Sequence, residues 1–197
     1  GSGTAWTDLI ESNNGTLTNG PTYSSDDGGY FSFDGSNDYV TTNLTRDNND
    51  FTYTAWFQYA SGTGERDIID TFESSSTEWT RLNIQNGKHA FQIDNNNNKV
   101  VLLGSDVQTN VWYYQAGTYD SSNGAMKLYV NGELNASTTH SQTGTISGLS
   151  NLRIGAIATS QSELFNGKIA CVTTYSRTLS ASEISQNFNA LRGRFGI

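Results

Sequence analysis

The chain has 197 residues, enough for one β-sandwich and too few for two ordinary domains joined by a linker. Only 15% of the residues are charged and the formal net charge is −8, which argues against nucleic-acid binding, because that depends on clustered Lys and Arg. No apolar run reaches the roughly eighteen residues that membrane insertion needs. The 20 glycines, the one proline and the abundant Asn, Ser and Thr favour turns and surface strands, so we expect an all-β protein.

Residues 1–3, Gly-Ser-Gly, are interpreted as a cloning remnant and residues 4–197 as a single domain. Short apolar-polar alternations separated by Gly, Asn and Ser then predict strands joined by turns. In chain order these strands are expected around 31–33 and from 39, then at 51–59, 67–72, 79–84, 88–93, 100–103, within 111–134, and at 152–155 and 167–175. The Asn-rich run 94–98 is predicted to be an exposed loop tip.

The longest single strand is predicted at Phe51–Tyr59. Its period of two places Phe51, Tyr53, Ala55 and Phe57 on one face and Trp56 on the other. Stretch 169–172 is also apolar, so its Cys171 is predicted to be a buried thiol with no disulfide partner.

The stretch 111–134 predicts a hairpin. Met126, Leu128 and Val130 alternate with polar neighbours, and residues 120–124 supply a turn that ends in Asn-Gly. A hairpin with one apolar face is not stable alone, so a second sheet must cover it.

A single helix is predicted near the end of the chain, up to about Leu191. Ser180 and Glu183 have the spacing of a capping box, and Leu179 and Ile184 occupy the staple positions around it. Ile184, Phe188 and Leu191 then form one apolar stripe that is expected to pack on the sandwich.

Five segments in this order resemble the laminin-G-like branch of the concanavalin A-like lectin/glucanase superfamily; they are 33–40, 51–56, 112–120, 128–132 and 167–184. The resemblance implies a jelly-roll sandwich of two antiparallel sheets, one face concave. It also implies glycan or protein binding more than catalysis. The ending, residues 187–197, resembles the C-terminus of such domains in bacteriophage virion and tail proteins.

Residues 65–70 can be compared with the catalytic motif of glycoside hydrolases in this superfamily. Laminarinase-type members of the superfamily carry Glu-x-Asp followed by a second Glu, with the two Glu residues on either side of the glycosidic bond. Here Glu65 and Asp67 match, but the last acid is the shorter Asp70. Because a misplaced catalytic carboxyl costs orders of magnitude in rate, we expect no enzymatic activity and no catalytic residues.

A calcium site is the one metal hypothesis. Asp34, Asn37 and Asp38 place oxygen atoms around one turn, as calcium prefers, although Asp-Gly and Asn-Asp are also ordinary turn formers. Family members often have an acidic residue where this chain has Ala170 and Cys171, which weakens the hypothesis. No cofactor is expected to be required.

Glycan binding is the favoured function, because aromatic faces stack on sugars while polar side chains read hydroxyl groups. The candidates, chosen as lying off the buried faces or beside loops, are Trp79, Arg81, Trp56, Tyr59, His89, Tyr113 and Tyr129. Trp79 ranks first because a polar loop leads into it, although each aromatic residue could equally be part of a core. His89 and His140 are predicted to lie on the surface.

The sequence thus predicts a non-catalytic carbohydrate-recognition or adhesion module. Its expected partner is a cell-surface or extracellular glycan, and its expected location is extracellular or on a virion surface, beside other virion proteins. The alternatives are a structural decoration or assembly domain that binds protein and, third, a glycoside hydrolase of the laminarinase type.

Overall fold

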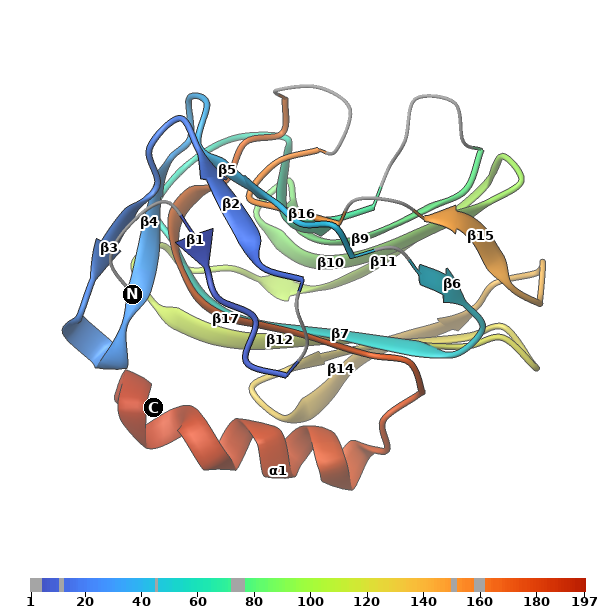
Figure 1. The fold of residues 1–197 in the computed structure, drawn as a ribbon. Coiled ribbons are helices and arrows are strands. Elements are labelled where there is room, and N and C mark those ends of the chain that lie inside the picture. Colours follow the sequence, from blue (N-terminus) through green and yellow to red (C-terminus); the bar gives the residue numbers. More distant parts are fainter. Residues whose placement is uncertain (1–4, 11–12, 45, 72–76, 150–151, 158–161) are drawn as a thin grey trace.

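The computed structural model describes residues 5–10, 13–44, 46–71, 77–149, 152–157 and 162–197. Two antiparallel sheets stack face to face (Figure 1). The eight-stranded sheet has the order β1 (Ala5–Trp6), β2 (Gly15–Thr18), β5 (Tyr39–Thr41), β16 (Arg153–Ile154), β8 (Glu65–Asp70), β9 (Trp79–Gln85), β10 (Lys88–Asn95) and β11 (Asn98–Asp106).

The seven-stranded sheet has the order β14 (Glu133–Thr139), β13 (Ala125–Val130), β12 (Trp112–Asp120), β7 (Phe51–Tyr59), β17 (Asn166–Tyr175), β4 (Tyr30–Asp34) and β3 (Thr22–Ser24). A separate pair joins β6 (Arg46–Asn48) to β15 (Ile146–Leu149). The helices are α1 (Ala181–Leu191) and the short 3₁₀ turns η1 (Asp26–Gly28) and η2 (Arg192–Phe195).

The predicted all-β jelly-roll sandwich with one short C-terminal helix is confirmed. The supposed cloning remnant, residues 1–3, lies outside the described residues.

The main core fills the space between the two sheets. Phe51 and Phe57 of β7 pack there with Leu82 of β9 and Phe91 of β10, all 0% exposed. Gly117 on β12 is needed for this packing, because a Cβ atom there would lie 2.5 Å from the Phe91 ring. The predicted inner face of the long strand is therefore confirmed.

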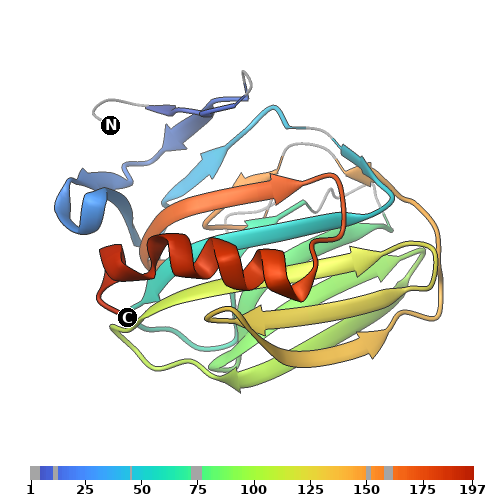
Figure 2. The ribbon, with the colours of Figure 1, turned by 90° about the horizontal axis from the view of Figure 1, so that it is seen from below.

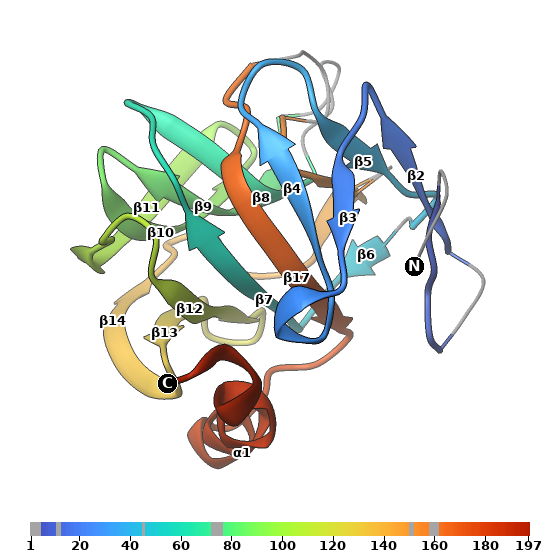
Figure 3. The same cartoon turned by 90° about the vertical axis from the view of Figure 1, so that its left-hand side faces the viewer.

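A second core lies on the other side of the seven-stranded sheet, beneath α1 (Figures 2 and 3). The predicted capping box is present, since the Ser180 side chain accepts from the Glu183 N–H and the Glu183 side chain accepts from the Ser180 N–H. Ile184 and Phe188 are buried against the sheet. The helix is thus fixed by its own N-terminus and by an apolar surface.

Tight turns set the register of the hairpins. Asn131 and Gly132 have φ of 51° and 83°, the positive values that a two-residue hairpin turn requires. Asn96 and Asn97 make the same kind of turn between β10 and β11, and both are exposed, so the loop tip predicted at 94–98 is present but shorter. The strands continue to Asn95, which is 3% exposed, and resume at Asn98.

The lone cysteine is less enclosed than predicted. Cys171 is half-buried: it pairs with Trp56 across β17 and β7, after a register irregularity that follows Ile169, and packs against the second core. Within the residues that the structure describes, no helix is long and apolar enough to span a membrane.

Candidate functional site

The outer face of the eight-stranded sheet carries an unusual set of polar side chains. In β9 the residues Leu82 and Ile84 point into the core, so Trp79, Arg81 and Asn83 point outward. Residues paired across strands share a face, which extends this surface to neighbouring strands. The polar face, as it is called below, comprises Tyr39, Glu65, Asp67, Asp70, Trp79, Arg81, Asn83, Gln92, Lys99, Arg153 and Glu163.

A β-bulge gathers three acids of β8 on this face. Asp67 pairs with Asn83, and Asp70 pairs with Arg81, with a register shift between Asp67 and Ile69. Without the shift, residues three apart would point to opposite faces. The bulge therefore places Asp67 and Asp70 on the same side of the strand.

Arg81 lies at the centre of the acids. Its Nε is 2.6 Å from Asp70 Oδ2, and its Nη1 is 3.0 Å from Glu65 Oε2 and 2.7 Å from Glu163 Oε2. Its side chain is only 6% exposed. Burial opposes the positive charge, but the surrounding carboxylates outweigh it, Asp67 most of all, and raise the pKa of Arg81.

Asp67 is the least compensated member of the cluster. It is 0% exposed, and neither carboxylate oxygen accepts a hydrogen bond from the described residues. The nearest guanidinium atom, Arg81 Nε, is 4.0 Å from its Oδ2. Burial, followed by repulsion from Asp70, raises the pKa of Asp67 well above its ordinary value, and Arg81 offsets only part of this.

Two amides of the polar face lack partners. The side chains of Asn83 and Gln92 are 0% exposed, and none of their amide atoms makes a hydrogen bond within the described part of the chain. A buried polar group without a partner costs about 1–3 kcal/mol, and native structures keep few of them. These amides therefore favour a face that meets water, an ion or a polar ligand.

Of the seven predicted binding residues, the polar face contains Trp79 and Arg81. Trp79 is 7% exposed, and its ring is already covered by cations: Arg81 Cζ lies 4.4 Å and Lys99 Nζ 5.1 Å from the ring centroid. Of the polar loop expected before it, residues 74–78, positions 74–76 lie outside the described residues. A second ring, Tyr39, has Arg153 at 4.4 Å.

The other five lie elsewhere, so the expectation that they avoid the buried faces was wrong for most of them. Trp56 and Tyr129 are buried beneath α1. Tyr59 packs in the main core and donates its hydroxyl to the Gly62 carbonyl at 2.7 Å. Tyr113 is partly buried at the edge of the same core. Period-two patterning identifies an outer face but does not show that a helix covers it.

The histidines are not on the surface. His89 is 0% exposed between the sheets, with Nδ1 2.7 Å from Gln115 Oε1 and its ring edge-on to Tyr113. Burial lowers the pKa of His89 to about 4. His140 is also fully buried, with Nε2 2.8 Å from the Asn98 carbonyl oxygen. Each ring is held by local polar partners, which hydropathy does not show.

The predicted calcium residues form the turn after β4. Asp34 Oδ1 accepts from the Ser36 N–H at 2.7 Å, and Asp38 Oδ2 accepts from the Asp34 N–H at 3.0 Å. These backbone contacts, the one from Ser36 above all, lower the pKa of Asp34, whereas burial raises that of Asp38. Asn37 donates its N–H to Asp34 as well. The turn accounts for these residue types, and calcium binding there stays a prediction.

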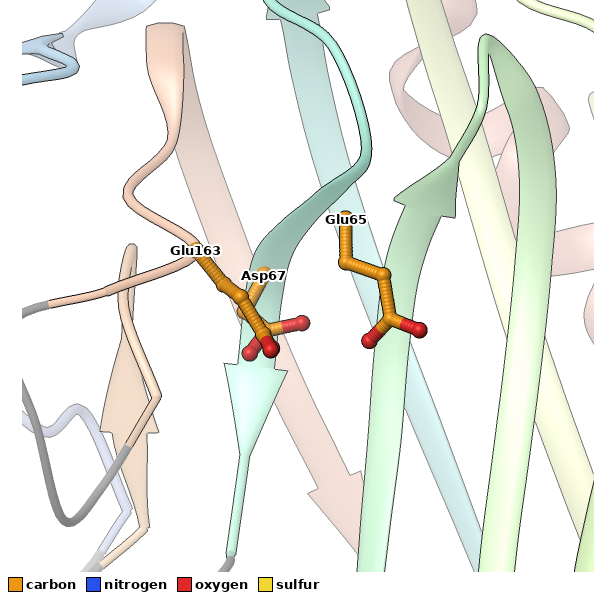
Figure 4. A group of neighbouring side chains, drawn as sticks. All are labelled: Glu65, Asp67 and Glu163. Carbon is orange, nitrogen blue, oxygen red and sulfur yellow. The ribbon is translucent and has the colours of Figure 1, made fainter.

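A different acidic group stands out. Glu65, Asp67 and Glu163 each offer a carboxylate oxygen, and these atoms lie within 4.8 Å of one another (Figure 4).

The sequence did not lead us to Asn83 and Gln92, although Asn83 lies two residues after Arg81 and so shares its face. Glu163 had no such signal, because its loop reaches β8 only in the folded chain: its carbonyl accepts from the Asp67 N–H at 2.9 Å.

The stacked antiparallel sheets and their outer polar face define a lectin-like β-sandwich. A family model, Laminin_G_3, described as the concanavalin A-like lectin/glucanases superfamily, matches residues 34–185, and the chain belongs to this superfamily. No curated protein sequence matches it.

Solved structures share the fold. The receptor binding domain of botulinum neurotoxin D matches with a TM-score of 0.76 at 17% identity over 94% of this chain and 51% of that one. The binding domain of Paraclostridial Mosquitocidal Protein 1 matches with a TM-score of 0.74 at 15% identity, over 94% of this chain and 51% of that one. A heptameric SAP-like pentraxin from Limulus polyphemus matches at 0.65, with 15% identity over 78% of each chain. The chain spans about half the length of the first two.

Proposed function

We propose that this domain is a non-catalytic recognition module that binds a cell-surface or extracellular glycan through the polar face. The observation that carries the proposal is a pair of buried amides beside Arg81, those of Asn83 and Gln92, which have no hydrogen-bond partner among the described residues. Sugar hydroxyls both donate and accept, so they can satisfy amides and carboxylates together, directly or through bridging water. Ligand contact would begin at the more exposed rim, Glu163 and Lys99, whose side chains are 28% and 39% exposed.

The arrangement of acids supports binding over hydrolysis. A retaining glycosidase needs one protonated acid and one free carboxylate. Here the two outer acids of the Glu-x-Asp-x-x-Asp segment, Glu65 and Asp70, both contact Arg81, at 3.0 Å and 2.6 Å. A carboxylate that is held by a guanidinium is not free to approach a leaving group.

The similar structures support a recognition role, since one is a receptor binding domain and another a binding domain. The rival function is a structural decoration or assembly domain that binds protein. An extracellular or virion-surface location, with other virion proteins as neighbours, is part of the proposal and is supported only by the kind of ligand expected.

A glycan array probed with this domain, with and without calcium, tests the proposal. A hit is then titrated against Lys99→Gln on the polar face and Lys127→Gln on the exposed side of β13, a matched change on the other sheet. We expect the first variant to weaken binding at least threefold and the second to leave it unchanged. No glycan bound at millimolar concentration would favour the assembly role instead.

A further inference from the structure

An apolar strip borders the buried amides of the polar face. Strands β9, β10 and β11 lie side by side at one end of the eight-stranded sheet (Figure 1). Because Phe91 and Leu102 point into the main core, their neighbours in the chain point outward. These neighbours, called the apolar strip below, are Ala90, Val101 and Leu103. The outer surface of β10 and β11 is therefore partly aliphatic.

The strand register places the apolar strip directly beside the amides. Asn83 pairs with Ala90, which pairs in turn with Leu103. One rung further along β10, Gln92 pairs with Val101. Side chains paired across neighbouring strands have Cβ atoms about 4.5–5.5 Å apart. Two amides and three aliphatic side chains are thus gathered in one small patch, which is fixed by backbone pairing.

Leu103 is the accessible part of this patch. Its side chain is 46% exposed and Val101 is half-buried, whereas the amides of Asn83 and Gln92 are 0% exposed and have no hydrogen-bond partner among the described residues. A single exposed leucine needs no explanation. A leucine beside buried amides that lack partners does, because native structures keep few such amides.

The amides and the apolar strip together complement one chemical group. The Asn and Gln side chains each offer two N–H donors and a carbonyl acceptor, so the pair can bind a group that donates and accepts, as a secondary amide does. An acetamido substituent is such an amide and ends in a methyl group, which gains from contact with aliphatic side chains. A hydroxyl group in its place would satisfy an amide but leave the strip in water.

We propose that the polar face selects sugars that carry an N-acetyl group. Asn83 and Gln92 hydrogen-bond the amide of that group, and Val101 and Leu103 contact its methyl. Because the two amides are 0% exposed, the group that reaches them must be small, as an acetamido group is and a sugar ring is not. This inference rests on the glycan-binding role proposed above and names the class of sugar.

Matched glycans on the array test the selectivity. N-Acetylchitotetraose and cellotetraose differ only in an acetamido or hydroxyl group at C2 of each sugar, and N-acetylgalactosamine and galactose form a second pair. We expect bound glycans to carry the acetamido group, and their hydroxyl counterparts to bind about tenfold more weakly or less, since these leave a buried amide unpaired. Chitotetraose with free amines is the third arm, which measures attraction of a cation to the acids.

The outcomes separate this inference from the proposed function. Equal binding within the pairs, binding confined to glycans without an acetamido group, or tighter binding of the free amine would overturn the selectivity and leave glycan binding standing. No glycan bound at all would overturn both.

Two variants locate the selectivity, with calorimetry on a bound pair as the measurement. Leu103→Ser should weaken binding of the acetamido member about threefold or more, because its methyl loses an aliphatic contact, and leave the hydroxyl member unchanged. Leu134→Ser, the same change at a leucine that is 54% exposed on β14 of the other sheet, is the matched control.

Gln92→Met removes the second amide at nearly constant volume. It replaces a buried polar group that has no partner among the described residues, so Tm should not fall, whereas the preference for the acetamido member should be lost. Wild-type selectivity in both Leu103→Ser and Gln92→Met would overturn the proposal.

Discussion

The ring of Phe195, two residues before the last residue of the sequence, stacks on Trp56 in the middle of β7, with centroids 4.3 Å apart and an interplanar angle of 22°. Phe188 of α1 stacks on the same indole at 5.7 Å and 13°. The C-terminal segment is therefore part of a core. It is not a decoration on a finished sandwich.

Phe188→Ala should lower the free energy of unfolding by about 3–5 kcal/mol, the usual cost of removing a buried aromatic ring. Urea unfolding followed by tryptophan fluorescence measures it, with Gln186→Ala on the exposed side of α1 as the control. The prediction fails if both variants unfold at the same urea concentration as the wild type.

Ser180→Ala should cost about 1 kcal/mol, because it leaves the Glu183 N–H without its capping acceptor. Gln186→Ala, an exposed position further along α1, is the control and should be nearly neutral. A comparison of urea midpoints at unchanged m-value measures both. Equal midpoints for the two variants would show that the capping box contributes nothing measurable.

His89 predicts a pH dependence of stability. Burial lowers its folded pKa to about 4 from 6.5, so between these values the unfolded chain binds the proton and the folded chain does not. The free energy of unfolding should therefore fall as pH drops through this window, by about 3 kcal/mol in total, and this contribution is complete above pH 6.5.

Denaturant unfolding at several pH values between 4.5 and 7.5 tests this, with His89→Gln as the comparison. The variant does not titrate there, so its stability should fall less steeply with decreasing pH than that of the wild type. Equal slopes for the two proteins would contradict the assignment.

Arg81→Met should destabilise the fold by about 3–5 kcal/mol at pH 7, because it leaves the carboxylates of a buried cluster without their central cation. Arg177→Met removes an ion pair with Glu183 at 2.7 Å, but that pair is exposed and screened by water, so its loss should destabilise the fold far less. Thermal and urea unfolding compare the two arginines. Similar losses would show that burial does not distinguish them.

Laminarin and related β-glucans should remain intact after prolonged incubation, because Arg81 contacts both outer acids of the β8 segment. Reducing-end assays measure this. Release of sugar by the wild type that is abolished in Glu65→Gln would show instead that the cluster is catalytic.

The fold could be predicted because strand faces and helix starts depend on residues that are close together in the sequence. Alternation identified the inner face of β7, and Ser180 with Glu183 marked the start of α1. The site did not follow, for a physical reason: Asp67 and Glu163 are 96 residues apart by numbering and meet only because β8 and the segment before β17 pack together. A bulge in β8 then reversed the side on which Asp70 lies, which spacing alone misassigns.

The two outer surfaces of the sandwich are unequal, since α1 and η2 occupy one and leave the polar face as the other. This difference between the two surfaces determines where a label can be attached without blocking the polar face. A fluorophore or biotin attached at Gln186, on the solvent side of α1, would present the polar face away from a sensor chip, whereas the same tag at Lys99 would obstruct it. The position of attachment should therefore determine whether a capture experiment detects a partner of the polar face.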